Sequence, residues 1–107
     1  MRYRAVVCSS LPASAMAIYP FMFFKSADLK SDQLIINHEK IHFKQQIELL
    51  ILPFYLLYLL NYCVNLLRYR DRRKSYLNIC FEKEAYVHDH NLNYLKGRRL
   101  YSWIKYF

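Results

Sequence analysis

Two histidines four residues apart, in the segment His38-Glu39-Lys40-Ile41-His42, constrain this chain more than any other feature. Side chains at this spacing lie on one face of an α-helix, so the two imidazoles can converge on a single metal ion only if the segment is helical. Two nitrogens do not complete a metal site, and the further ligand must come from elsewhere in the chain. The sequence therefore predicts a helix with a second, distant segment packed against it.

The later segment Phe81–Tyr86 offers the candidate for that ligand. The chain has only four glutamates, and two of them, Glu82 and Glu84, fall in this segment. On a helix these two point to different faces, so both cannot reach one metal. The apolar Ile79 and Cys80 precede Glu82 at spacings that put bulk on its side, which favours Glu82 as the inward ligand. The alternative is a solvated helix in which the motif is a chance match.

The metal-site interpretation assigns a role to the residues around the ligands. Glu39 lies between the two histidines in sequence and would face a metal-activated water as a general base, with zinc the expected metal. Candidates to hold the ligands by hydrogen bonds are Tyr86, Gln45, Gln46 and Asp89. Glutamines at surface positions are more often solvated, and the sequence favours that interpretation for Gln45 and Gln46.

Composition and periodicity predict a mainly α fold with a short β element (α+β). Hydrophobic residues make up 55% of the 107 residues, and there is a single glycine, which favours packed helices in one domain over residues 1–107. We expect an edge strand or hairpin within residues 15–25, followed by three to four helices. The first helix is expected to start after Asp32 and to end at about Leu52, because Pro53 disfavours helical geometry in the residue before it.

A later helix is expected from Arg73 to His90, with a break at Gly97 and a short aromatic tail. Trp103 and Phe107 are the residues through which this tail is expected to pack on the body of the protein.

The apolar run before Pro12 is too short for a signal peptide. Three cysteines without a CxxC pair fit a reducing compartment, and we expect a cytoplasmic protein.

Residues 49–67 contain no charged side chain, so this stretch is a candidate for contact with a membrane. A single crossing would place His38 and Glu82 on opposite sides of the bilayer, where they could not share a metal. Pro53 also divides the run, and tyrosines and asparagines recur along it at helical spacings. The sequence therefore favours a helix that is buried or lies in the membrane interface, with residues 49–69 as the contact segment.

The chain is basic, with a formal net charge of +8. One cluster is formed by Arg68, Arg70, Arg72, Arg73 and Lys74. Such a cluster attracts an anionic membrane surface or RNA, although a charge run is more often simply solvated than a specific nucleic-acid site. A non-catalytic basic module is therefore one alternative for this protein.

The pair of motifs formed by His38-Glu39-Lys40-Ile41-His42 and Glu82-Lys83-Glu84-Ala85-Tyr86 resembles that of the gluzincin group of zinc metallopeptidases. In integral-membrane branches of this group, the third ligand is a glutamate three residues before a small Ala or Cys. The resemblance implies zinc bound by His38, His42 and Glu82, with Ala85 as the small residue. The family usually has an aspartate after the small residue, whereas this chain has Tyr86.

The resemblance implies a minimal gluzincin-like domain that hydrolyses peptides or unfolded proteins with Glu39 as the base. From Ile18 onward the chain also resembles short bacterial proteins that share its Asn-His-Glu-x-Ile-His, Pro-Phe-Tyr and Phe-Glu-x-Glu-Ala-Tyr blocks, which implies no particular function. The other alternative is a structural protein that zinc stabilises without turnover.

Overall fold

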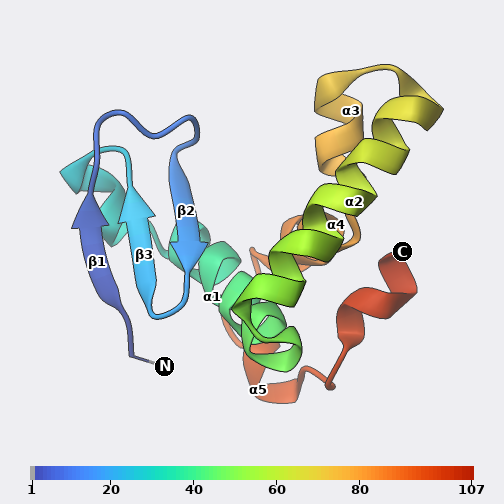
Figure 1. The fold of residues 1–107 in the computed structure, drawn as a ribbon. Coiled ribbons are helices and arrows are strands. Elements are labelled where there is room, and N and C mark those ends of the chain that lie inside the picture. Colours follow the sequence, from blue (N-terminus) through green and yellow to red (C-terminus); the bar gives the residue numbers. More distant parts are fainter. Residues whose placement is uncertain (1) are drawn as a thin grey trace.

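The computed structural model describes residues 2–107 and shows a small sheet followed by helices (Figure 1). The elements are β1 (Arg4–Val7), β2 (Ala15–Ile18), β3 (Phe21–Phe24), the 3-10 helix η1 (Ala27–Ser31), α1 (Gln33–Leu49), α2 (Ile51–Tyr69), α3 (Arg72–Leu77), α4 (Cys80–His88), α5 (Tyr94–Gly97) and the 3-10 helix η2 (Ser102–Tyr106). The predicted α+β class is confirmed. In Figure 1 the sheet lies to one side of the molecule, and α2 with α3 lies to the other.

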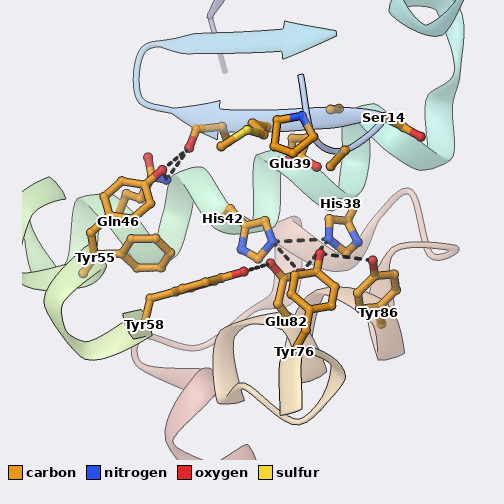
Figure 2. A pocket seen from close by; sticks show the side chains of 16 residues that line it. Ser14, His38, Glu39, His42, Gln46, Tyr55, Tyr58, Tyr76, Glu82 and Tyr86 are labelled. Atoms are coloured by element: carbon orange, nitrogen blue, oxygen red, sulfur yellow. Dashed lines mark hydrogen bonds and ion pairs between the residues drawn. The ribbon is translucent and has the colours of Figure 1, made fainter. Parts of the chain in front are cut away.

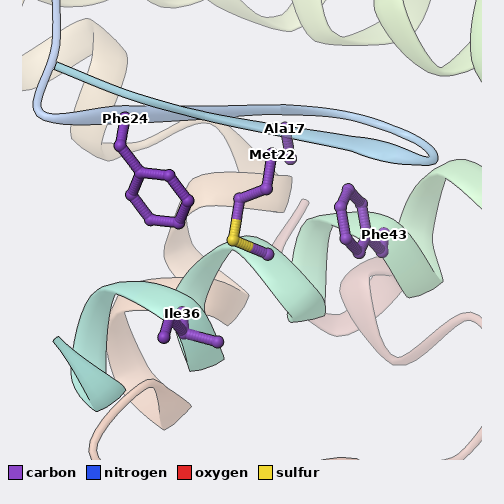
Figure 3. Packing of buried hydrophobic residues seen from close by; sticks show 5 residues of the cluster. All are labelled: Ala17, Met22, Phe24, Ile36 and Phe43. Carbon is purple, nitrogen blue, oxygen red and sulfur yellow. The ribbon is translucent and has the colours of Figure 1, made fainter. Parts of the chain in front are cut away.

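The sheet has the strand order β1-β3-β2, with β1 parallel and β2 antiparallel to β3. The hairpin of β2 and β3 lies within the predicted residues 15–25, whereas β1 was not predicted. Successive strand residues point to opposite faces, so Met22 and Phe24 both face α1, where they pack with Ile36 and Phe43 (Figure 3). This cluster holds the sheet on α1 and leaves β2 as an edge strand.

Helix α1 starts where the sequence predicts and ends earlier. The Asp32 carboxylate caps the helix by accepting hydrogen bonds from the backbone N–H groups of Leu34 and Ile35, at 3.0 and 3.3 Å. The predicted end near Leu52 is wrong, because Leu50 leaves the helical region with φ 65° and ψ 156°. Pro53 lies in the first turn of α2, where its missing N–H would have no intrahelical partner in any case.

The predicted continuous helix from Arg73 to His90 is also wrong, because the helix is interrupted between α3 and α4. Ile79 is buried in an extended conformation, and the backbone N–H of Cys80 donates to Asn61 Oδ1 on α2 at 2.8 Å. This hydrogen bond caps the start of α4 from outside its own segment. The break lets α3 pack along α2 while α4 turns to pack against α1.

A second apolar cluster lies between α2, α4 and the C-terminal tail. Its buried members are Phe54, Ile79, Cys80, Phe81 and Trp103. Trp103 is buried as expected, but Phe107 is 73% exposed, so its predicted docking is wrong. The tail is held instead by Tyr106, which packs against this cluster and whose hydroxyl lies 2.7 Å from His88 Nε2.

The strained backbone at Leu50 leads to a stability prediction. Its combination of positive φ with ψ near 156° is a region that residues other than glycine occupy at a cost. Leu50→Gly should therefore raise the free energy of unfolding by about 1 kcal/mol. Leu60→Gly, at an exposed position inside α2, should lower it by about 1 kcal/mol. Urea unfolding followed by circular dichroism measures the stability of both variants. A loss of stability in both would contradict the inference that the backbone is strained at Leu50.

Candidate metal centre

Three buried side chains meet between α1 and α4. His38 and His42 project from α1, one turn apart, towards Glu82 in the first turn of α4 (Figure 2). Glu82 Oε1 lies 3.2 Å from His38 Nε2 and 3.1 Å from His42 Nε2, and the two Nε2 atoms lie 3.2 Å apart. The structure thus brings together the three residues that the sequence predicts as ligands, and they could hold a metal ion.

The outer nitrogens of both rings face hydrogen-bond acceptors. His38 Nδ1 lies 3.0 Å from Asp89 Oδ2, and His42 Nδ1 lies 2.8 Å from Gln45 Oε1. The Gln45 orientation is fixed, because its amide nitrogen donates to the carbonyl of Phe81 and to Glu84 Oε1. When the rings are neutral, each Nδ1 carries the proton, which directs both Nε2 lone pairs at each other and at the carboxylate. Three acceptors converging on one point are the arrangement that a cation stabilises.

The pKa values of Glu82 and His42 are shifted by the electrostatic interaction between these side chains. Burial alone would raise the pKa of Glu82, but the two histidines outweigh it and hold this pKa well below its usual value. Burial lowers the pKa of His42, but Glu82 reverses the shift and raises it to about 9. A protonated His42 supplies a positive charge at this point, so a proton would compete with any metal ion that bound there.

Glu39 belongs to the same site but not to the ligand cluster. It is buried on the side of α1 that faces β2 (Figure 2), and burial raises the pKa of its carboxyl. Among residues 2–107, none donates a hydrogen bond to this carboxylate. Glu39 is thus a buried carboxyl beside the cluster whose oxygens are free to accept or give a proton.

Asp89 is the acidic side chain that contacts His38, and Tyr86 has a different role. Tyr86 makes no hydrogen bond with His38; its ring packs on the imidazole, with centroids 4.5 Å apart. Asp89 lies one helical turn beyond Tyr86, which brings its carboxylate to the same histidine. The sequence named both Asp89 and Tyr86 as candidates to hold the ligands, and the structure brings Asp89 into hydrogen-bond distance of His38.

The two glutamines are buried, so the prediction that they are solvated is wrong. Gln45 orients His42 as described above. Gln46 does not approach the ligands: its amide nitrogen donates to the Ala17 carbonyl at 2.8 Å, and its oxygen accepts from the Tyr19 backbone at 2.8 Å. Gln46 therefore holds β2 against α1 beside the site.

Tyr58 is a contact of the site that sequence reasoning missed. Its hydroxyl donates to Glu82 Oε2 at 2.6 Å and so fixes the oxygen that does not face the histidines. The signal was present in the sequence, because Tyr58 belongs to the tyrosine and asparagine stripe along residues 55–69. What the sequence could not give was the direction in which that stripe faces.

A second network lies behind the site. The Arg98 guanidinium binds Glu48 and Glu84, and Glu84 also accepts from Tyr94 and Gln45. Burial alone would raise the pKa of Glu84, but these hydrogen bonds, led by that from Arg98, hold it below its ordinary value. The network thus connects the C-terminal segment through Gln45 to His42.

The cluster opens into a cavity of about 580 Å³. Glu39 and the three ligands line it from α1 and α4, Tyr55 and Tyr58 from α2, and residues 12–17 from β2 and the loop before it. The predicted basic surface lies apart from this cavity: Arg68, Arg70, Arg72, Arg73 and Lys74 are exposed around the end of α2 and the start of α3.

Comparison with known proteins adds no assignment. No protein-family model matches the chain, and no match is found among curated proteins or solved structures. The gluzincin resemblance therefore stays a prediction from the two motifs.

The contact between Asp89 and His38 predicts an effect on metal affinity. Asp89→Ala removes the acceptor that fixes the ring orientation, and should weaken metal binding about 10- to 100-fold. Asp28→Ala removes an exposed acid from η1 and should leave affinity unchanged. Titration against a chromophoric chelator measures both. Equal affinities in the two variants would contradict an orienting role for Asp89.

The network behind the site predicts how stability depends on pH. Arg98→Met leaves Glu48 and Glu84 as buried charges without their partner, and should lower the free energy of unfolding by about 3 kcal/mol at neutral pH. The depressed pKa of Glu84 means that its stabilisation is present at neutral pH and is lost as the pH falls through the folded-state value. Without Arg98 that pKa rises, so acid unfolding should begin at a higher pH.

The control for this substitution is Arg99→Met, which removes a neighbouring exposed charge. Unfolding by urea at a series of pH values compares the two variants. If the two variants lose the same free energy of unfolding at every pH, the network around Arg98 does not account for the pH dependence of stability.

Proposed function

We propose that this protein is a zinc-dependent metallopeptidase, with His38, His42 and Glu82 as ligands and Glu39 as general base. The observation that carries the proposal is the convergence of the two Nε2 atoms and Glu82 Oε1 within 3.1 to 3.2 Å of one another, beside a buried free carboxylate. Atoms bound to a tetrahedral zinc at about 2.0 to 2.1 Å lie about 3.3 Å apart. The two imidazoles and the carboxylate are also ligand types that zinc accepts.

The metal ion and Glu39 would have separate roles in the proposed reaction. A zinc ion held there would supply a Lewis acid and an activated water molecule. Glu39 would take a proton from the attacking water and deliver it to the leaving amine. Its raised pKa supports this role, because a base that must also return a proton works best when its pKa is closer to neutral pH.

The cavity also contains a candidate donor for the carbonyl oxygen of a substrate. The hydroxyls of Tyr76 and Tyr86 lie 3.3 Å apart, and both residues line the cavity. Burial raises the pKa of both hydroxyls, so they stay protonated at neutral pH. The hydrogen bond between the two tyrosines uses only one of their two hydroxyl protons. The other hydroxyl can therefore donate to the negative charge that develops on the substrate oxygen.

The edge strand β2 can hold an extended peptide across the site. In its register with β3, Met16 and Ile18 direct their backbone groups to β3, and Ala15 and Ala17 direct theirs outward. The Ala17 carbonyl is bound by Gln46 and Tyr55, at 2.8 and 2.6 Å. Among residues 2–107, none bonds the outward groups of Ala15 or the N–H of Ala17. These groups can pair with a substrate backbone along the cavity.

The proposal predicts different effects for two glutamate substitutions. The purified protein should bind about one zinc ion per chain and cleave unfolded casein. Glu39→Gln should keep the metal and lose at least about 100-fold in rate, because only the base is removed. Glu82→Gln should lose both metal and activity. Metal analysis by mass spectrometry and a fluorescent casein assay measure these outcomes.

Two results would contradict the proposal. A wild-type protein that binds no zinc is not a zinc peptidase. A protein whose zinc raises its melting temperature but which cleaves no peptide, with or without Glu39, is a structural zinc protein.

A further inference from the structure

The outward face of α2 is apolar, which is the reverse of an ordinary surface helix. Phe54, Asn61 and Asn65 are the buried residues on its inward face. The opposite face is formed by Leu52, Leu56, Leu59, Leu60, Cys63 and Leu67. Leu52 is 71% exposed and Leu67 is 82% exposed. A leucine face of this length is stable against an apolar phase and costs free energy in water.

Basic residues border this face at one end. Arg68, Arg70, Arg72, Arg73 and Lys74 follow it directly, with Asp71 as the only acid among them. The cationic groups of Arg68 and Lys74 lie over the ring of Tyr69, at 6.0 and 4.8 Å from its centroid. An apolar helix face bordered by tyrosine and basic side chains is the pattern of a helix that lies in the interface of an anionic membrane.

The contacts of the inward face show that α2 lies along the body of the protein. Asn65 Nδ2 donates to the Ser75 carbonyl at 3.0 Å, and Asn61 binds the start of α4. Length and composition alone would let α2 span a bilayer. A spanning orientation, however, would carry α3 and α4 into hydrocarbon together with charged residues such as Lys83. Docking with the helix axis in the plane of the membrane avoids this cost.

We propose that α2 docks on an anionic membrane surface, with its leucine face among the upper acyl chains and the basic cluster of residues 68–74 against the headgroups. Charge complementarity decides between this occupant and a second copy of the chain. Each chain has a net charge of +8, so two copies repel each other, whereas an anionic surface attracts each of them.

Docking in this orientation sets the distance between the cavity and the lipid. Tyr55 and Tyr58 on α2 line the cavity, whereas the leucines on the other side of the same helix face outward. The site then lies about 10 Å, one helix diameter, from the acyl chains. This inference is independent of the proposed peptidase activity, because it uses no ligand or catalytic residue.

Cys63 allows the docking to be measured directly. It is exposed on the leucine face, whereas Cys80 is buried, so Cys8→Ser leaves Cys63 as the accessible thiol. An environment-sensitive fluorophore on Cys63 should shift to shorter emission wavelengths with vesicles of phosphatidylcholine that contain about 30% phosphatidylserine, as expected for a basic segment at an anionic surface. The shift should be much smaller with pure phosphatidylcholine.

Two pairs of substitutions separate the contributions of the apolar face and the basic cluster. Arg72→Gln with Arg73→Gln should weaken vesicle binding about 30-fold, since each basic residue near the surface adds about 1 kcal/mol. Lys96→Gln with Arg99→Gln removes the same charge from exposed positions far from the cluster of residues 68–74 (Figure 1) and should weaken it far less. Leu56→Gln with Leu60→Gln should weaken it about 100-fold or more, because two leucines no longer enter the acyl region. Binding of unlabelled protein is measured by co-sedimentation.

Several results would overturn this inference. Equal effects of the two charge pairs would show that no oriented surface is involved. Absence of vesicle binding together with a dimer in sedimentation equilibrium, lost in the leucine double variant, would assign the face to a second copy. Resistance to alkaline carbonate extraction would show that α2 spans the bilayer rather than lying on it. Circular dichroism confirms that each variant is folded before it is compared.

Discussion

One carboxylate oxygen, Glu82 Oε1, holds the centre of this structure together, because it lies between two imidazoles of another helix. Such a group loses its hydration on burial, and it is stable only if every lost contact with water is replaced. Tyr58 donates to Oε2, and protonated His42 or a bound cation provides the positive partner of Oε1. The packing of α1 against α4 must therefore be exact to a fraction of a helical turn.

Two amides on α1 fix that packing on either side of the ligands. Asn37 Nδ2 donates to the Asp89 carbonyl at 2.7 Å and to the Asn91 carbonyl at 2.9 Å, where α4 ends. Gln45 donates to the Phe81 carbonyl at 3.0 Å, near the start of α4. These residues lie just before His38 and just after His42, so they set both the rotation and the translation of one helix against the other.

Local features of the chain could be predicted from sequence, whereas features that depend on a partner segment could not. The spacing of His38 and His42 required a helix and a packed neighbour, and Asp32 marked the start of that helix. The break before α4 is stabilised by Asn61, which is nearly twenty residues earlier in the chain. Likewise, helical spacing placed both Asp89 and Tyr86 on the face of Glu82, but which of the two contacts His38 depends on how α4 is rotated against α1.

The site lies at the junction of two small apolar clusters, one between the sheet and α1 and one between α2, α4 and the tail. Neither cluster alone is a large core, and the polar ligands lie where α1 meets α4 between them. A metal ion that binds His38, His42 and Glu82 binds only when the two helices are in register. Its binding free energy then adds to the free energy of folding, so the centre that would perform the chemistry also connects the two halves of the domain.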